Sequence, residues 1–127
     1  MAYFSDLSSY SYWPGEESAL NVGWLDVQHV FPTGGVDEVF FQKLLHLCCH
    51  PVKRTRGYHV CPFCATPAFG QEVRLQGKSF KLGDAEIRVR GENGDVFASP
   101  NLIYHYVQGH HYRPPQAFID AVARVEV

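Results

Sequence analysis

The chain has 127 residues, of which 46% are hydrophobic and 19% are charged, and its formal net charge is -2. This length and composition indicate one globular domain over residues 1–127. They exclude a membrane-spanning protein, because no apolar run approaches the roughly 18 residues that a span needs.

The start of the chain and the number of cysteines predict the compartment. Residues 1–17 contain no basic region followed by an apolar run, so they do not resemble a signal peptide and we expect a cytoplasmic protein. In that compartment the four cysteines are expected to be thiols or metal ligands and not disulfides.

Charge is distributed unevenly along the chain. Residues 53–90 hold eight basic and three acidic residues, whereas residues 1–52 hold one basic and six acidic residues. A basic middle segment could face nucleic acid or an acidic partner, although oppositely charged segments of one small fold can simply pack near each other. The basic residues concerned are Lys53, Arg54, Arg56, Arg74, Lys78, Lys81, Arg88 and Arg90.

Residues 1–35 are expected to be mostly irregular. Turn-forming residues dominate 11–17 and 31–35, and one short strand is expected between them, over 19–27. The aromatic residues of this segment are expected to pack in the core; they are Tyr3, Phe4, Tyr10, Tyr12, Trp13 and Trp24.

The clearest helix is predicted over residues 34–51. Apolar residues recur there at steps of three and four, namely Val36, Val39, Phe40, Leu44 and Leu47. Asp37 and Glu38 are expected in the first turn, where they complement the helix dipole, and Pro51 is expected to end the helix.

Three short strands are predicted next, separated by turns that contain glycine. They cover residues 72–76, 85–91 and 94–99. Ile87 and Val89 alternate with Arg88 and Arg90, so one face of that strand is apolar and the other is basic. This alternation is typical of a half-buried antiparallel sheet.

Two further helices are predicted in the C-terminal third. The first covers 99–115, with Ser99 as its cap, Pro100 at its first position and Gly109 as a left-handed stop. The last covers 114–125, and its expected buried residues are Phe118, Ile119, Val122 and Val125.

Cys61-Pro62-Phe63-Cys64 is a motif with two chemistries. In a glutaredoxin such a motif exchanges disulfides, and in a zinc knuckle it aims two thiolates at one metal. A redox enzyme needs a helix directly after the first cysteine, because the helix dipole lowers the thiol pKa. Pro67 and Gly70 disfavour such a helix, and no convincing βαβ unit surrounds the motif.

A zinc site needs two more ligands, and we expect them to be His105 and His110. Their separation lies within the spacing typical of Cys2His2 sites. On an ideal helix these positions diverge by about 140°, so Gly109 is expected to release the chain from helical geometry before His110. His59 and His111 are the substitutes if one of these two histidines is not a ligand.

A second group of possible ligands lies at the end of the first predicted helix. His46 and His50 share one helical face, but no third ligand is evident beside them. Cys48 and Cys49 are expected to pack as small buried hydrophobic residues.

Four stretches in a fixed order resemble a family of small bacterial proteins that carry a domain of unknown function. They are "NVGWL", "TRG-x-H-x-CPFC", "SPNLIYHYV-x2-H" and "YRPPQAFIDAV". The resemblance covers nearly the whole chain and implies that Cys61, Cys64, His105 and His110 share a site. It implies no activity.

The sequence therefore predicts a single α+β domain with a small antiparallel sheet and flanking helices, stapled by a structural Cys2His2 zinc site. A closed site of this kind disfavours metal catalysis, and no other catalytic motif is evident. The favoured role is a non-catalytic binding or regulatory module acting on another protein. The alternatives are a nucleic-acid binder using the basic 53–90 segment and a thiol-disulfide oxidoreductase using Cys61 and Cys64.

Overall fold

The computed structural model describes residues 3–10, 18–54, 59–64 and 71–127. The helices are α1 (Glu38–Cys49), α2 (Ile103–His110) and α3 (Gln116–Ala123). The strands are β1 (Ser9–Tyr10), β2 (Ala19–Asn21), β3 (Lys53–Arg54), β4 (Gln71–Leu75), β5 (Lys78–Leu82), β6 (Ala85–Arg90) and β7 (Val96–Pro100).

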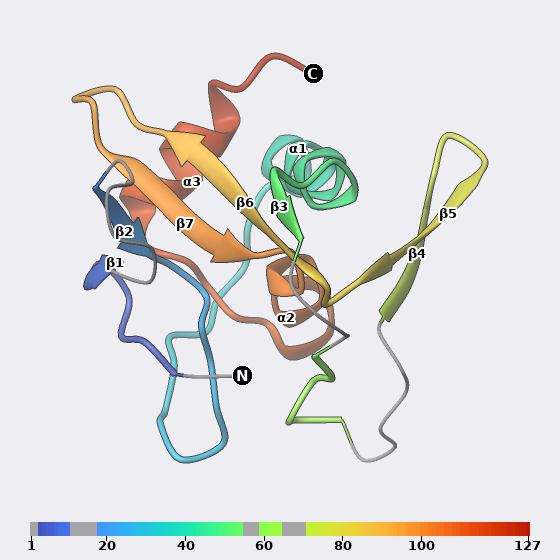
Figure 1. The fold of residues 1–127 in the computed structure, drawn as a ribbon, viewed down its shortest axis with the longest axis horizontal. Helices are drawn as coiled ribbons and strands as arrows, with labels where there is room; N and C mark the ends of the chain where they lie inside the picture. The colour runs from blue at the N-terminus through green and yellow to red at the C-terminus, as the bar shows by residue number, and fades with distance from the viewer. Residues whose placement is uncertain (1–2, 11–17, 55–58, 65–70) are drawn as a thin grey trace.

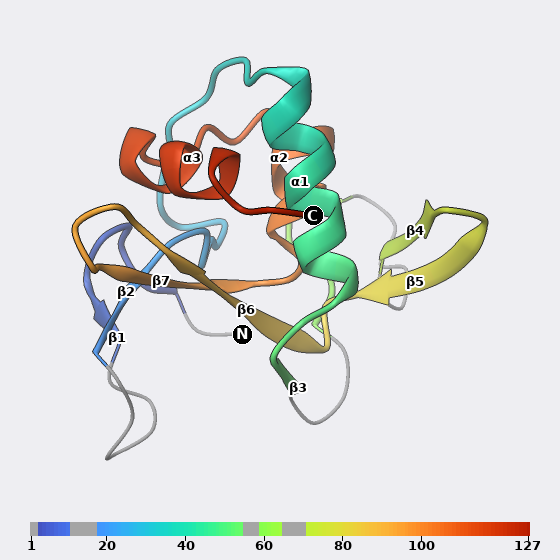
Figure 2. The same cartoon turned by 90° about the horizontal axis from the view of Figure 1, so that it is seen from above.

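These elements form two layers and a projecting hairpin. Five strands make one sheet in the order β1-β2-β7-β6-β3, and the three helices lie on one side of it (Figure 1 and Figure 2). Strands β4 and β5 form a separate hairpin that extends from the body beside α1 (Figure 1). The predicted α+β class is confirmed.

The sheet is mixed and not wholly antiparallel. Strand β2 runs parallel to β7, with Leu20 opposite Phe97, and the other neighbouring strands are antiparallel. The predicted strand over 19–27 therefore forms only at its start. Just beyond Asn21 the Val22 N–H donates to the Ala98 carbonyl at 3.0 Å, and the indole Nε1 of Trp24 donates to the same carbonyl at 3.0 Å. A side chain therefore adds to the backbone pairing where the strand ends.

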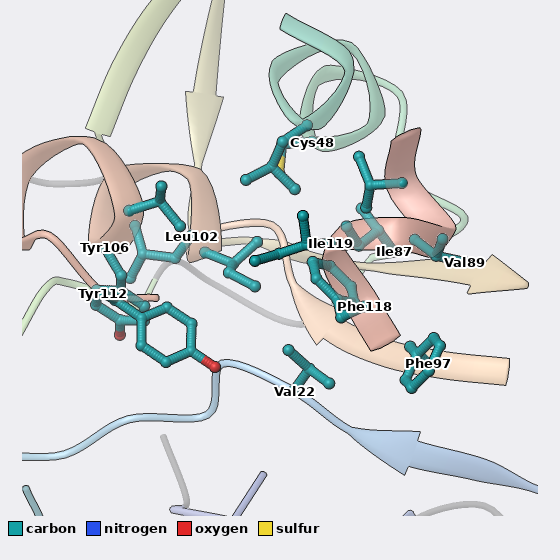
Figure 3. Close-up of a cluster of buried hydrophobic side chains, with 14 of the residues drawn as sticks. Val22, Cys48, Ile87, Val89, Phe97, Leu102, Tyr106, Tyr112, Phe118 and Ile119 are labelled. Carbon is teal, nitrogen blue, oxygen red and sulfur yellow. The ribbon is translucent and has the colours of Figure 1, made fainter. Parts of the chain in front are cut away.

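The helices cover the apolar face of the sheet. Ile87 and Val89 are buried, as their alternation predicts, and join a core with Phe97 and Phe118. The Phe97 and Phe118 rings pack edge to face at 5.8 Å, and Figure 3 shows Phe118 and Ile119 of α3 within this cluster. None of the helices in the described part of the chain is long and apolar enough to cross a membrane.

Helix α1 is shorter than predicted and its buried face is shifted. Asp37 is the N-cap, and its carboxylate accepts a hydrogen bond from the Phe40 N–H at 2.8 Å. The buried stripe includes Phe40, Leu44 and Cys48, so Val39 lies on another face and is 57% exposed. Val39 belongs to the predicted apolar repeat of this helix but is not part of the core.

Two predictions about α2 are also wrong. Ser99 and Pro100 are the last residues of β7, opposite Ile87 and Glu86, so they cannot start a helix. Helix α2 starts at Ile103 instead. The last helix is predicted closely, since α3 buries Phe118, Ile119 and Val122.

Strand β5 was missed because its sequence offers little alternation. Lys78, Ser79 and Lys81 are all exposed, whereas the ring of Phe80 lies 5.8 Å from that of His50 and Leu82 is buried at the end of the strand. Its pairing with β4, for example Val73 opposite Phe80, forms the hairpin. Among residues used in the predictions, those outside the described ranges are Tyr12, Trp13, Arg56, Pro67 and Gly70.

Candidate metal centre

Four side chains from two distant segments converge beside α2. Cys61 and Cys64 lie in a turn, whereas His105 and His110 both lie on α2. Their four ligand atoms are all within 4.8 Å of one another, so the group could hold a metal ion. Cys64 and His105 are 41 positions apart in the chain, so tertiary folding creates the cluster.

The distances within the cluster match a tetrahedral site. Cys61 Sγ lies 3.2 Å from His110 Nε2, and Cys64 Sγ lies 3.3 Å from His105 Nε2 and 3.6 Å from His110 Nε2. Zinc bonds of about 2.3 Å to sulfur and about 2.0 Å to nitrogen, at tetrahedral angles, place sulfur and nitrogen about 3.5 Å apart. The three distances differ from that value by only a few tenths of an ångström.

Neighbouring groups orient the two thiols. The Phe63 N–H donates to Cys61 Sγ at 3.4 Å, and Gln71 Nε2 donates to Cys64 Sγ at 3.9 Å. Such donors compensate negative charge on sulfur and fix the ligand's direction. Gln71 begins β4, so this contact also joins the projecting hairpin to the cluster.

The aromatic ring of Phe63 anchors the turn against the body. It packs on Phe31 at 5.2 Å, on Tyr106 at 5.8 Å and on the His110 imidazole at 5.4 Å, measured between ring centroids. Tyr106 lies on α2 between the two histidines and is fully buried. The turn and α2 are therefore held together by apolar packing as well as by the polar cluster.

Gly109 contributes to the cluster in a way that differs from the prediction. It lies inside α2, and the left-handed residue that ends the helix is His111, with φ of 59°. A Cβ atom at Gly109 would lie 3.2 Å from His105 Cε1. The missing side chain thus leaves space for the His105 ring, whose centroid lies 5.0 Å from that of His110.

A set of buried hydrogen bonds around Asn101, which was not predicted and is called the Asn101 junction below, holds the chain just before the Cys61–Cys64 turn. Asn101 accepts a hydrogen bond from the Gly83 N–H at 2.8 Å and donates to the Cys48 carbonyl at 3.3 Å. The Gly83 carbonyl in turn accepts from the His59 N–H at 2.8 Å. Gly83 has φ of +114°, and a Cβ there would lie 2.4 Å from the His59 oxygen, so only glycine fits.

Burial shapes the electrostatics of the cluster. Burial raises the pKa of the Cys61 thiol to about 11, and it lowers the pKa of His105, with His110 adding to that effect. Both shifts favour the uncharged side chain, because a charge in a partly desolvated site costs free energy. A bound cation reverses this preference at sulfur, since it stabilises the thiolate, and neutral imidazole is the form that binds metal.

The substitute ligands do not join the cluster. His59 is tied to Gly83 through its backbone, and His111 is exposed at the end of α2. Within the described ranges, the structure brings three or more possible metal ligands together in one group, which consists of Cys61, Cys64, His105 and His110.

The second group of possible ligands has a structural explanation. His50 Nδ1 lies 2.9 Å from the His46 carbonyl, and the two imidazole centroids are 4.5 Å apart. Cys48 and Cys49 lie on the buried side of α1, as predicted.

Part of the basic segment is neutralised by neighbouring carboxylates. Arg54 pairs with Asp84 at 2.7 Å, and Arg88 pairs with Glu86 at 2.9 Å. The Arg88 guanidinium also lies 4.7 Å from the centre of the Tyr10 ring, whose hydroxyl donates to Glu86 at 2.9 Å. These ion pairs form within the basic segment itself, so its own carboxylates offset part of its positive charge.

The fold and the site define a small α+β domain with a cysteine-histidine cluster that could hold a metal. A family model, the domain of unknown function DUF7919, matches residues 2–123, and the chain belongs to this family. No curated protein and no solved structure matches the chain.

Proposed function

We propose that the protein binds one structural Zn²⁺ through Cys61, Cys64, His105 and His110. The observation that carries the proposal is the convergence of two sulfur and two nitrogen atoms within 4.8 Å. Two thiolates and two imidazoles in tetrahedral arrangement favour zinc over calcium or magnesium, which prefer oxygen ligands.

The role that this site supports is a clamp and not a catalyst. Four protein ligands complete the coordination of zinc and leave no position for a reacting water. The ion joins the Cys61–Cys64 turn to α2 and stabilises the surface that these elements form. We accordingly propose a non-catalytic binding or regulatory module acting on another protein. All four cysteines are unpaired, which supports a reducing compartment such as the bacterial cytoplasm.

Two other roles have less support. An oxidoreductase requires a first cysteine with a lowered pKa, whereas burial raises the pKa of Cys61 to about 11. A nucleic-acid binder needs basic residues that can reach phosphates, whereas Arg54 and Arg88 bind Asp84 and Glu86. A titration with single- and double-stranded nucleic acid at low salt tests the latter role, and a salt-dependent complex would support it.

The decisive experiment for the metal is elemental analysis of protein purified without added metal, followed by thermal unfolding with and without a chelator. We expect one zinc per chain and a large fall in melting temperature after chelation, because metal binding to such a site is coupled to folding. Well under one zinc per chain, or an unchanged melting curve after removal of the metal, would contradict the proposal.

A further inference from the structure

We propose that Cys64 is a site of oxidation by hydroperoxides, and that the resulting Cys61–Cys64 disulfide releases the metal. This inference rests on the proposed zinc site and adds a chemical trigger to it. The trigger requires an accessible metal-bound sulfur and a second sulfur close enough to resolve the first oxidation product.

The four cysteines differ sharply in their access to solvent. Cys48, Cys49 and Cys61 are 1%, 5% and 3% exposed, whereas Cys64 is only partly buried. Oxidation of cysteine follows thiolate character and exposure. As a metal ligand Cys64 is a thiolate, and among the four cysteines it combines that character with access to a small oxidant.

The resolving sulfur is already in place. Cys61 Sγ belongs to the cluster whose ligand atoms lie within 4.8 Å of one another, and the chain of a Cys-x-x-Cys turn can bring such sulfurs into bonding distance. Cys48 and Cys49 lie on α1, and neither belongs to this cluster. Resolution by Cys61 is therefore favoured over resolution by either of them.

The chemistry balances with a hydroperoxide as the oxidant. The Cys64 thiolate attacks one peroxide oxygen, the O–O bond breaks, and a sulfenic acid and a hydroxide form. The Cys61 thiolate then attacks the Cys64 sulfur, the S–S bond forms, and the S–O bond breaks with loss of a second hydroxide. Two electrons leave the two sulfurs and reduce the peroxide to two hydroxides.

Disulfide formation removes half of the ligand set. His105 and His110 remain, and two imidazoles hold zinc far more weakly than the complete four-ligand site. Loss of the ion breaks the cross-link between the turn and α2, while the packing of Phe63 on Tyr106 and Phe31 remains. The released state is thus expected to be loosened around the turn and not globally unfolded.

The experiment treats zinc-loaded protein with hydrogen peroxide in the presence of a chromogenic zinc chelator. We expect one zinc to be released for each disulfide formed. The disulfide should lie in the tryptic peptide of residues 57–74, which contains both Cys61 and Cys64, and mass spectrometry should show the loss of two hydrogen atoms there. The peptide of residues 44–53, which contains Cys48 and Cys49, should stay reduced. A thiol reductant and added zinc should restore the loaded form.

Two variants sharpen the test. Cys64→His keeps four ligands but removes the exposed sulfur, so peroxide should release its zinc at least about tenfold more slowly. The double substitution of Cys48 and Cys49 by Ala should release zinc at the wild-type rate. If Cys64→His does not load zinc, the peptide mapping of the wild-type protein decides alone.

The outcomes separate this inference from the proposed function. Purified protein without zinc would overturn the metal centre and the inference together. Zinc that a strong chelator removes but peroxide does not, or peroxide oxidation confined to Cys48 and Cys49, would overturn the inference alone and leave the metal centre standing.

Discussion

Gly109 lies four residues after His105 on α2, and a Cβ atom at Gly109 would stand 3.2 Å from His105 Cε1 and 3.5 Å from Nδ1. The φ angle of Gly109 is not in the left-handed region, so the backbone conformation does not require glycine there. The absence of a side chain instead leaves room for the His105 imidazole. Two histidines five positions apart point about 140° apart on an ideal helix. The His105 imidazole can lie over Gly109, which has no side chain, and both histidines can therefore reach the sulfurs of Cys61 and Cys64.

Gly109→Ala separates helix stability from metal binding. Alanine is favoured over glycine inside a helix by about 1 kcal/mol, so the backbone alone would gain from the change. The new methyl group pushes the His105 ring from its place, however, and we expect zinc affinity to fall about tenfold or more. Competition with a chelator of known affinity measures this loss. Gly35→Ala, where a Cβ meets no atom within 4 Å, is the matched control and should keep full affinity.

Removal of a proposed ligand should cost the metal and the stability together. Cys61→Ser or His105→Ala breaks the ligand set, and a structural zinc can contribute on the order of 10 kcal/mol at neutral pH. We expect both variants to purify without zinc and to unfold cooperatively at a much lower temperature than the zinc-loaded wild-type protein. His111→Ala should do little, because His111 is exposed and lies outside the cluster. Normal zinc content and melting in His105→Ala would refute its role as a ligand.

The sequence predicted the partners of the cluster but not the way in which they meet. Motif spacing pointed to Cys61, Cys64, His105 and His110, because ligand chemistry limits the residue types and local spacing limits the choices. Helix periodicity found α3 almost completely, since its apolar residues recur in one stripe.

The features that the sequence did not predict depend on long-range contacts. The start of α2 was misplaced because Ser99 and Pro100 satisfy helix-start rules locally but pair with β6 in the sheet. The parallel pairing of β2 with β7 joins residues such as Leu20 and Phe97 that share no local signal. The role of Asn101 is likewise invisible locally, because its partners come from two other parts of the chain.

Asn101→Ala should destabilise the whole domain. The change removes the acceptor for the Gly83 N–H and the donor to the Cys48 carbonyl, both in a buried environment. A buried polar group left without its partner costs about 1–3 kcal/mol, so we expect a loss of about 2 kcal/mol or more. Chemical denaturation of the zinc-loaded protein measures it. Asn93→Ala is the control: Asn93 is exposed and accepts only a long hydrogen bond from the Asp95 N–H at 3.4 Å. An equal effect of the two substitutions would contradict the role of the Asn101 junction.

Acidification should destabilise the protein in both metal states, but to different extents. In the metal-free protein the pKa of His105 is lowered by burial and by His110, so the unfolded chain takes up a proton near pH 6.5 while the folded chain does not. The unfolded state then binds more protons, and the free energy of unfolding falls as pH drops below about 6.5. In the zinc-loaded protein, protons compete with the metal at thiolates and imidazoles alike, so the fall should begin at higher pH and be steeper. Melting temperatures between about pH 7.5 and about pH 5.5, with and without zinc, test this. His111→Gln should leave both curves in place, and a zinc-loaded curve that is flat over this range would contradict the proposed ligand set.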